Sequence, residues 1–210
     1  MSEEPSQPHD LPARYPVTMY VHGRAVVFGG GEVGMRKAVS LMRCGIPVCV
    51  IDRADVAHHE GVEHIRADVD KDSFKRFIDD TTSLVVCALD DPALNDVIAD
   101  YCMDRSIPVN VATSRSKGSV AFPAILDCGH ELLAVSSSNA CPLCSHALKR
   151  YIAAELPNIA TFSLLMHHLF DEGMLDGDIV ASILDDGTAM ALIREGRFED
   201  ALGHVRKVIL

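Results

Sequence analysis

Three glycines near the start of the chain have the spacing of a phosphate-binding turn. They read Gly29-x-Gly31-x-x-Gly34 and stand between an apolar run, 24–28, and a segment of helical periodicity, 35–44. Glycine permits a tight turn and lets backbone amides approach a pyrophosphate, whose charge a helix N-terminus stabilises. A strand before the turn and a helix after it make this motif specific, so we expect a dinucleotide site here. The loop expected to contact it comprises Gly29, Gly30, Gly31, Glu32, Val33 and Gly34.

An acidic residue ends the next apolar run, 47–52. The Asp52 carboxylate is placed to accept hydrogen bonds from an adenosine ribose, which favours NAD over NADP. Arg53 keeps NADP open as an alternative, because a guanidinium at this position could meet a 2′-phosphate. The competing interpretation is a glycine turn without a ligand, followed by a surface aspartate.

The motif Cys141-x-x-Cys144-x-His146 forms a second group with chemical potential. Two thiolates and an imidazole at this spacing could bind a soft metal such as zinc. If a helix begins near Pro142, both cysteines lie at its N-terminus, where thiol pKa values tend to be lowered. The alternative is that both cysteines are small packing residues. Cys128 and His130, in the preceding turn, are candidates to complete a site.

Strands and helices must position these groups, and the first half of the chain alternates between them. The alternation predicts an α/β fold with a Rossmann-type, doubly wound parallel sheet. A polar segment with His58, His59 and His64 is expected to face water, and 70–80 to form a surface helix. The expected strands are 24–28, 47–52, 83–89 and 108–112, and the expected helices are 35–44 and 93–105.

The pattern changes after residue 115. Apolar runs at 119–126 and 131–136 flank a short polar turn, which predicts a β-hairpin, and 142–156 is expected to be a helix. The remainder has a helical pattern interrupted by glycines. We therefore expect a loose arm at 1–18, a dinucleotide-binding domain at 19–115, a hairpin-and-helix dimerisation or active-site segment at 116–156, and a helical C-terminal domain at 157–210.

Composition excludes several classes of partner. The formal net charge of −11 argues against nucleic acid and against an anionic membrane surface. No apolar run approaches the roughly 18 residues that a membrane span needs. Seven cysteines, an odd number, indicate reduced thiols and a cytoplasmic location rather than a disulfide framework. The polar N-terminus has no apolar signal core.

Residues 20–151 resemble the precorrin-2 dehydrogenase / sirohydrochlorin ferrochelatase family, the NAD-binding part of siroheme synthase. The resemblance rests on four segments in the family's order: 25–45, 85–96, 107–126 and 131–150. The first contains Gly-Gly-Gly-x-Val-x-x-Arg-Lys, Gly29 to Lys37, a fairly specific element. The second contains Ala-Leu-Asp-Asp-Pro-Ala-Leu-Asn, and the third ends near Phe122-Pro123-Ala124.

The resemblance implies a specific reaction. Such enzymes pass a hydride from precorrin-2 to NAD, giving sirohydrochlorin, and some then insert Fe²⁺, which Cys141, Cys144 and His146 could meet as a chelation substrate. It also implies a homodimer. In that picture Asn110 lies at a strand end facing the cleft, and the residues near the nicotinamide half are Ala88, Leu89 and Asp90.

The chain departs from the family pattern at its acid/base position. The family commonly reads Asn-Val-x-Asp, where this chain has Asn110-Val111-Ala112-Thr113. A threonine hydroxyl without a partner is no general base near neutral pH. Thr113 and Ser114 could still orient a substrate carboxylate, with His146 as a further catalytic candidate. The alternative is a non-catalytic descendant that binds a tetrapyrrole or a nucleotide.

The tetrapyrrole substrate carries many carboxylates, so an acidic protein needs local cations to bind it. The resemblance places several basic residues and a serine beside the cleft, and a solvated surface is the alternative for each. They are Arg115, Lys117, Ser137, Lys149 and Arg150. A second departure follows Ser137, where the family has glycines and Ser-Pro and this chain continues Ser138-Asn139-Ala140-Cys141-Pro142.

Overall fold

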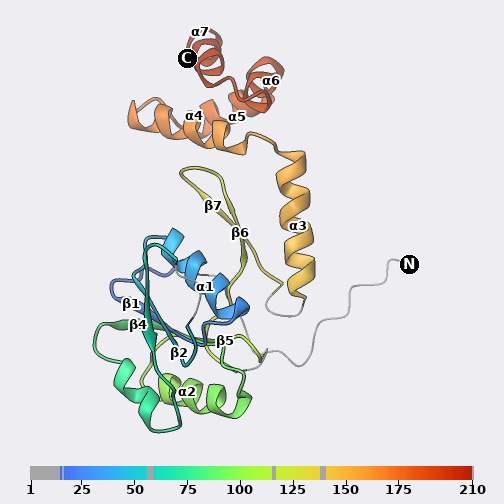
Figure 1. Cartoon of the computed structure of the whole chain (residues 1–210). Helices are drawn as coiled ribbons and strands as arrows, with labels where there is room; N and C mark the ends of the chain where they lie inside the picture. Colours follow the sequence, from blue (N-terminus) through green and yellow to red (C-terminus); the bar gives the residue numbers. More distant parts are fainter. Residues whose placement is uncertain (1–14, 16, 56–58, 115–116, 138–140, 210) are drawn as a thin grey trace. The chain divides into compact units, whose positions relative to one another are not determined.

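The computed structural model describes residues 15, 17–55, 59–114, 117–137 and 141–209. The chain divides into two compact units, with the division after Phe122 (Figure 1). The stretch 117–122 therefore belongs to the first unit, which extends beyond the expected boundary at residue 115. Most of the expected N-terminal arm, and Arg115, lie outside the described residues.

The first unit is built on a five-stranded sheet in the order β3-β2-β1-β4-β5. Every neighbouring pair is parallel, which confirms the predicted Rossmann-type sheet. The strand at its centre is fully buried from Ala25 to Phe28. The strands are β1 (Arg24–Phe28), β2 (Val48–Asp52), β3 (Val62–Arg66), β4 (Thr82–Cys87) and β5 (Val109–Val111).

Helices cover both faces of this sheet. Side chains alternate between faces along a strand, so Val27 packs in the cluster of α1 (Glu32–Arg43), whereas Phe28 packs with α2 (Pro92–Asp104). The 3₁₀ helix η1 (Ser73–Phe77) covers the second face as well. Each fully buried aliphatic or aromatic side chain of these clusters contributes about 1.5–3 kcal/mol.

Two expectations for this unit are wrong. The histidine-rich segment contains the edge strand β3, in which His64 is half-buried and its Nε2 is enclosed without a partner among the described residues. His59 is exposed, as expected, and His58 lies outside the described residues. The stretch 70–80 forms only the short helix η1, because the Asp70 carboxylate accepts from the Asp72 and Ser73 amides and starts a tight turn. Phe74 of that helix is fully buried.

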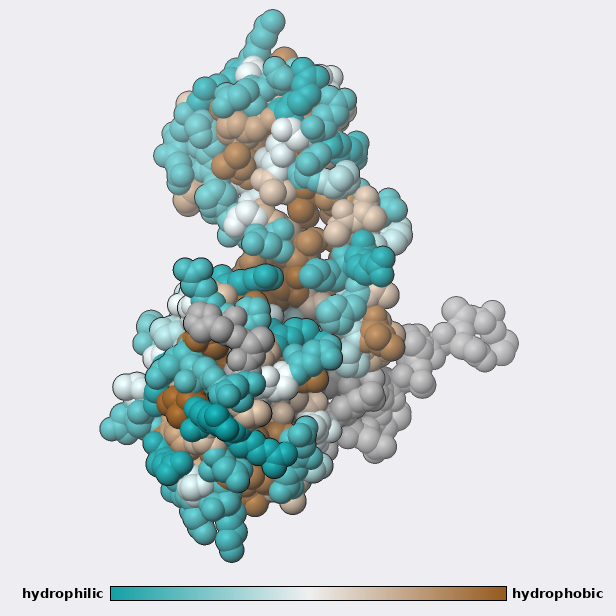
Figure 2. Space-filling view, viewed as in Figure 1, coloured by the Kyte–Doolittle hydropathy of each residue, from teal (hydrophilic) through white to brown (hydrophobic). Residues whose placement is uncertain are grey.

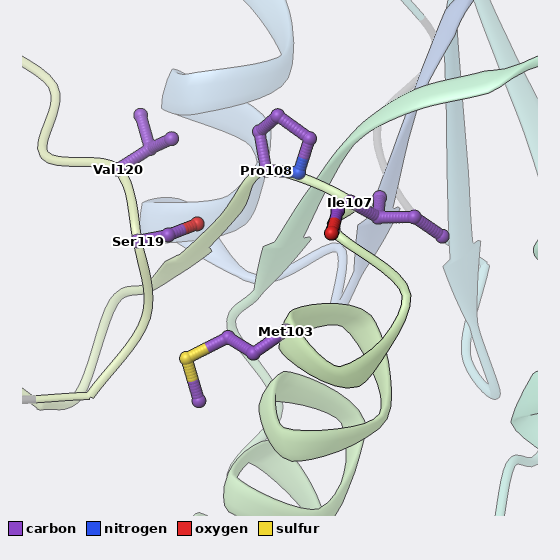
Figure 3. A pocket seen from close by; sticks show the side chains of 6 residues that line it. Met103, Ile107, Pro108, Ser119 and Val120 are labelled. Atoms are coloured by element: carbon purple, nitrogen blue, oxygen red, sulfur yellow. The ribbon is translucent and has the colours of Figure 1, made fainter.

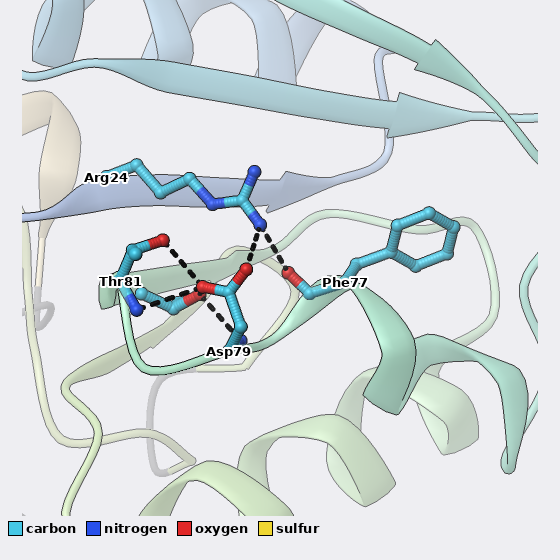
Figure 4. A network of polar contacts seen from close by, with 5 residues as sticks. Arg24, Phe77, Asp79 and Thr81 are labelled. Atoms are coloured by element: carbon cyan, nitrogen blue, oxygen red, sulfur yellow. Dashed lines mark hydrogen bonds and ion pairs between the residues drawn. The ribbon is translucent and has the colours of Figure 1, made fainter.

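A polar network fixes the amino end of the sheet (Figure 4). Arg24 Nη2 donates to Asp79 Oδ2 at 2.9 Å and to the Phe77 carbonyl at 3.3 Å. Asp79 Oδ1 accepts from the Thr81 hydroxyl at 2.6 Å and from the Thr81 amide at 3.0 Å. These hydrogen bonds, the hydroxyl's first, lower the pKa of Asp79. The network joins β1 to the turn before β4.

The second unit contains the predicted hairpin and helices. β6 and β7 pair antiparallel around a turn with Gly129 at φ +90°. Leu165, Leu169, Ile183 and Val205 belong to the core of the last four helices. On the face of the molecule seen in Figure 2, hydrophobic residues lie among hydrophilic ones. The elements are β6 (Ala124–Asp127), β7 (Leu132–Val135), α3 (Pro142–Glu155), α4 (Ile159–Asp171), α5 (Gly177–Asp185), α6 (Gly187–Arg194) and α7 (Phe198–Val208). No helix in the described part of the chain is both long and apolar enough to cross a membrane.

Candidate functional site

The residues expected to hold the cofactor gather along one edge of the first unit's sheet. Parallel strands all end at the same edge, and there the glycine loop follows β1, Asp52 ends β2 and Ala88 follows β4. Thr113 comes shortly after β5, at the same edge. The sheet order places β1 and β4 side by side in the middle. This edge is where open α/β sheets bind ligands.

Gly29 and Gly34 are required by close backbone crossings. Gly29 has a φ of +101°, and a Cβ atom there would lie 2.3 Å from the Ala88 carbonyl oxygen. A Cβ atom on Gly34 would lie 1.9 Å from the Gly29 carbonyl oxygen. The Gly29 amide also donates to the Ile51 carbonyl at 2.9 Å. A residue with a side chain would push the loop away from the strands. Glycine, which has no Cβ atom, permits the close approach.

Gly31 has a different environment. It is the N-cap of α1, with an ordinary φ of −65° and no side-chain capping bond, and a Cβ atom there would meet nothing within 4 Å. The first helical bond runs from the Met35 amide to the Gly31 carbonyl, so the amides of Glu32, Val33 and Gly34 have no partner within the helix. Open space beside uncapped amides fits an incoming pyrophosphate.

Asp52 is oriented by the loop itself. Its Oδ2 accepts from the Gly30 amide at 2.7 Å, and its Oδ1 accepts from the Ala54 amide at 2.8 Å. An ionised carboxylate has about four acceptor positions, so it can still receive ribose hydroxyls. Arg53 is exposed, and its guanidinium has no partner within the described residues. The geometry therefore fits a dinucleotide.

Asn95 is a site residue that the sequence analysis did not single out. It is fully buried on α2, and its Oδ1 accepts from the Leu89 amide at 3.1 Å. Its Nδ2 donates to the Leu89 carbonyl at 2.8 Å and to Thr113 Oγ1 at 3.3 Å. Asn95 thus joins the segment after β4 to the segment after β5. The sequence feature that could have identified Asn95 is its place as the last residue of the Ala-Leu-Asp-Asp-Pro-Ala-Leu-Asn segment.

Asn110 and Lys117 take structural positions in the first unit. Asn110 is 4% exposed, and its Nδ2 donates to the Val120 carbonyl at 2.7 Å. Its Oδ1 is buried and has no partner among the described residues. Lys117, expected to bind substrate carboxylates, pairs with Asp100 of α2 at 3.1 Å. Ser114 Oγ accepts from the Lys117 amide at 3.2 Å.

Lys37 of the Arg-Lys element lies on α1 above an aromatic ring. Its Nζ is 4.6 Å from the centroid of Phe122. Burial and, to a lesser extent, the neighbouring Arg36 lower the pKa of Lys37 to about 8. The contact holds the 120–122 segment against the α1 face of the sheet.

The expected metal site in the second unit is not formed. The sulfur atoms of Cys141 and Cys144 are joined in a disulfide, with their Cα atoms 5.2 Å apart. The expectation that all the cysteines are reduced is therefore wrong at this pair. His146 is exposed, Cys128 is buried, and His130 stacks on His167. Among the described residues, no three His, Cys, Asp or Glu side chains are grouped to hold a metal ion.

The remaining substrate candidates of the second unit lie on α3 and at the end of β7. Lys149 is half-buried and Arg150 is exposed. The Ser137 amide donates to Ser145 Oγ at 2.9 Å, and Ser137 Oγ accepts from the Cys141 amide at 3.1 Å. Ser137 is therefore held to the first turn of α3.

A shallow hollow of about 440 Å³ lies elsewhere in the first unit (Figure 3). It sits at the amino end of β5, opposite the edge that carries the glycine loop, and its walls are mostly apolar. It is lined by Met103, Ser106, Ile107, Pro108, Ser119 and Val120. None of the expected cofactor residues contributes to it.

Known proteins are similar to this chain in sequence and in fold. The model of a family described as "Putative NAD(P)-binding" matches residues 19–124. The siroheme synthase of Pseudomonas entomophila is 32% identical over 142 residues, which are 65% of this chain and 30% of that protein. Siroheme synthase 1 of Halorhodospira halophila is 35% identical over 153 residues, 69% of this chain and 30% of that protein. The chain therefore spans under a third of the length of these relatives.

The solved structure of "SirC, precorrin-2 dehydrogenase" has the same fold. It superposes with a TM-score of 0.68 at 20% identity and covers 92% of this chain and 100% of its own. Because the match covers 92% of this chain, the likeness in fold extends into both units.

Proposed function

We propose that this chain, which belongs to the family described as "Putative NAD(P)-binding", binds NAD and oxidises precorrin-2 to sirohydrochlorin. The observation that carries this proposal is the loop at Gly31. Open space there adjoins the uncapped start of α1, and the neighbouring Gly30 amide is bonded to Asp52. A pyrophosphate and an adenosine ribose would occupy these two positions.

Each part of the site has a separate task. The amides of Glu32 and Val33 would bind the pyrophosphate, and Asp52 would accept hydrogen bonds from the ribose hydroxyls. Ala88, Leu89 and Asp90 would contact the nicotinamide half, and NAD would supply the acceptor for a hydride. Asn95 holds the backbone of Leu89 in place through two hydrogen bonds.

Oxidation also releases a proton from the substrate. Thr113 Oγ1 accepts from Asn95, so its own hydroxyl hydrogen is free to donate to a substrate carboxylate. Thr113 thus orients substrate and removes no proton. Because Thr113 is exposed, the proton can pass to water without a buried base. Ser114 and His146 remain further candidates for contacts with the reacting ring.

Substrate carboxylates would bind to the basic groups of the second unit. Lys149 and Arg150 are free of ion pairs among the described residues, and Ser137, at the end of β7, offers a hydroxyl. Arg115 belongs to the same proposal, although it lies outside the described residues. Arg–carboxylate contacts supply both affinity and orientation.

A second copy of the chain would cover the apolar surface of α3. Leu143 is 82% exposed, Tyr151 is 63% exposed and Leu148 is 50% exposed. Several large apolar side chains exposed on one helix are typical of a protein interface. We expect a homodimer by light scattering, and monomers for the double variant Leu148→Glu, Tyr151→Glu. Val97→Glu, on exposed α2 surface in the other unit, is the matched control and should stay dimeric.

Anaerobic turnover tests the reaction directly. Purified protein, precorrin-2 and NAD should give the spectrum of sirohydrochlorin together with NADH. The product should fail to appear without NAD and with Gly31→Asp. Turnover that continues unchanged in Gly31→Asp would overturn the assignment of the loop.

Thr113 itself favours a second candidate function, binding without catalysis. A lapsed enzyme would bind NAD and tetrapyrrole but show no turnover, and Thr113→Asp would restore it. If neither protein oxidises precorrin-2, insertion of Fe²⁺ into sirohydrochlorin is the activity to measure next. In that case Fe²⁺ is a substrate, delivered to the macrocycle.

A further inference from the structure

The disulfide between Cys141 and Cys144 occupies an accessible position. Cys144 is exposed and Cys141 is half-buried, at the start of α3. Of the other cysteines, Cys44 is exposed, and four are buried in the two units: Cys49, Cys87, Cys102 and Cys128. The bonded pair can therefore be reached from solvent without unfolding the protein.

The two sulfur atoms have unequal surroundings. Cys141 is the N-cap of α3, Pro142 is the first helical residue, and the Cys144 amide donates to Cys141 Sγ at 3.2 Å. That amide and the positive end of the helix would stabilise negative charge on the Cys141 sulfur when the disulfide opens. Cys144 lies further out and can be approached by an attacking thiolate.

The pair is also connected to the end of β7. The Cys141 amide donates to Ser137 Oγ at 3.1 Å, and the Ser137 amide donates to the buried hydroxyl of Ser145 at 2.9 Å. Ser145 follows Cys144 directly on the helix. A change in the bonding of the two sulfur atoms therefore acts on Ser137 through a chain of two hydrogen bonds.

We propose that Cys141 and Cys144 form a thiol–disulfide exchange site whose partner is the dithiol of a small redox protein. One partner thiolate attacks Cys144 Sγ, the Cys141–Cys144 bond breaks, and Cys141 leaves as a thiolate that takes up a proton. The partner's second thiol, as its thiolate, then attacks the mixed disulfide and releases Cys144. The chain gains two electrons and two protons, and the partner becomes a disulfide. The step is independent of the proposed dehydrogenase activity.

Alkylation of the folded protein, followed by mass spectrometry, tests the accessibility of the pair. In air-equilibrated buffer, N-ethylmaleimide should add once, at Cys44. After dithiothreitol without denaturant it should add three times, at Cys44, Cys141 and Cys144. Cys44→Ser is the matched control and should show no adduct before reduction and two after it. The ratio of reduced to oxidised protein should be proportional to the first power of the ratio of reduced to oxidised dithiothreitol.

A redox protein lacking its second cysteine tests the direction of attack. It should be trapped as a mixed disulfide with Cys144, located by peptide mapping. Trapping at Cys141 would overturn the assignment of the two sulfur atoms. Three adducts before reduction would show that the disulfide is absent, and a requirement for denaturant would show that it is inert. If a chelator without any reductant made Cys141 and Cys144 reactive toward N-ethylmaleimide, the pair would be a metal site and the proposal would be wrong.

Discussion

Gly31→Asp should abolish dinucleotide binding without weakening the fold. The glycine adopts an ordinary φ of −65°, and a side chain there would meet open space, so the substitution creates no clash within the protein. Aspartate is also among the best N-cap residues, because its carboxylate can accept from the free amides of the first turn. The variant is expected to melt at the wild-type temperature or above it.

The loss of binding follows from charge. In the proposed complex the new carboxylate would stand against a pyrophosphate of the same sign. Two unit charges about 5 Å apart at an effective dielectric constant of about 20 repel by about 3 kcal/mol. The carboxylate would also occupy the first-turn amides that the pyrophosphate needs. Since about 1.4 kcal/mol is tenfold in Kd, NAD affinity should fall by more than about 100-fold.

Gly31→Asn separates charge from size. Asparagine is nearly isosteric with aspartate and caps helices equally well, but it is neutral. Titration calorimetry with NAD should therefore rank wild type above Gly31→Asn, and Gly31→Asn above Gly31→Asp. If Gly31→Asp binds NAD as wild type does, the pyrophosphate does not lie at the start of α1 and the site assignment is refuted. Equal losses in both variants would refute the electrostatic part.

Three further predictions concern stability, measured by urea denaturation. Asn95→Ala should lower the free energy of unfolding by about 2–3 kcal/mol, because the Leu89 amide and carbonyl lose their partner. An unchanged urea midpoint would contradict this. Lys37 has a folded pKa of about 8, below its unfolded value of 10.5, so only the unfolded chain binds that proton between these values. Wild type should therefore gain about 1–2 kcal/mol relative to Lys37→Met as the pH rises through that window, and a flat difference would show that Lys37 is solvated. Asp79→Ala should be less stable at pH 7, and the difference should shrink as the pH falls below 3.8 and through the lowered pKa of Asp79; a constant difference would mean that its charge is unimportant for holding Arg24.

The centre of the fold could be predicted because burial dominates its sequence. Strands β1, β2 and β4 are nearly continuous apolar runs, which a sheet covered by helices on both faces requires. The glycines at 29 and 34 mark the crossing of the loop over β4, and Gly45, at φ +78°, follows the end of α1. In these segments the local pattern and the packing demand the same structure.

The edge of the sheet was harder to predict because its side chains are half-exposed. β3 has the sequence Val-Glu-His-Ile-Arg, in which polar and apolar residues do not alternate cleanly. Its strand conformation comes from pairing with β2, from Val48↔Val62 to Asp52↔Arg66. Similarly, Cys141 and Cys144 become a disulfide through the geometry of one helical turn, and the number of cysteines in the chain says nothing about that.

The case of Thr113 shows what the structure adds to a departure from a family pattern. From the sequence, threonine in place of aspartate indicates only that a base is missing. In the structure, the buried Asn95 still directs an N–H group at the side chain of residue 113, 3.3 Å from its oxygen. An N–H donor at this position would also hold a carboxylate, and hydrogen bonds to a carboxylate favour its ionised form. The surroundings of residue 113 therefore remain suited to aspartate, so Thr113→Asp can introduce a charged acceptor without rearranging Leu89 or α2.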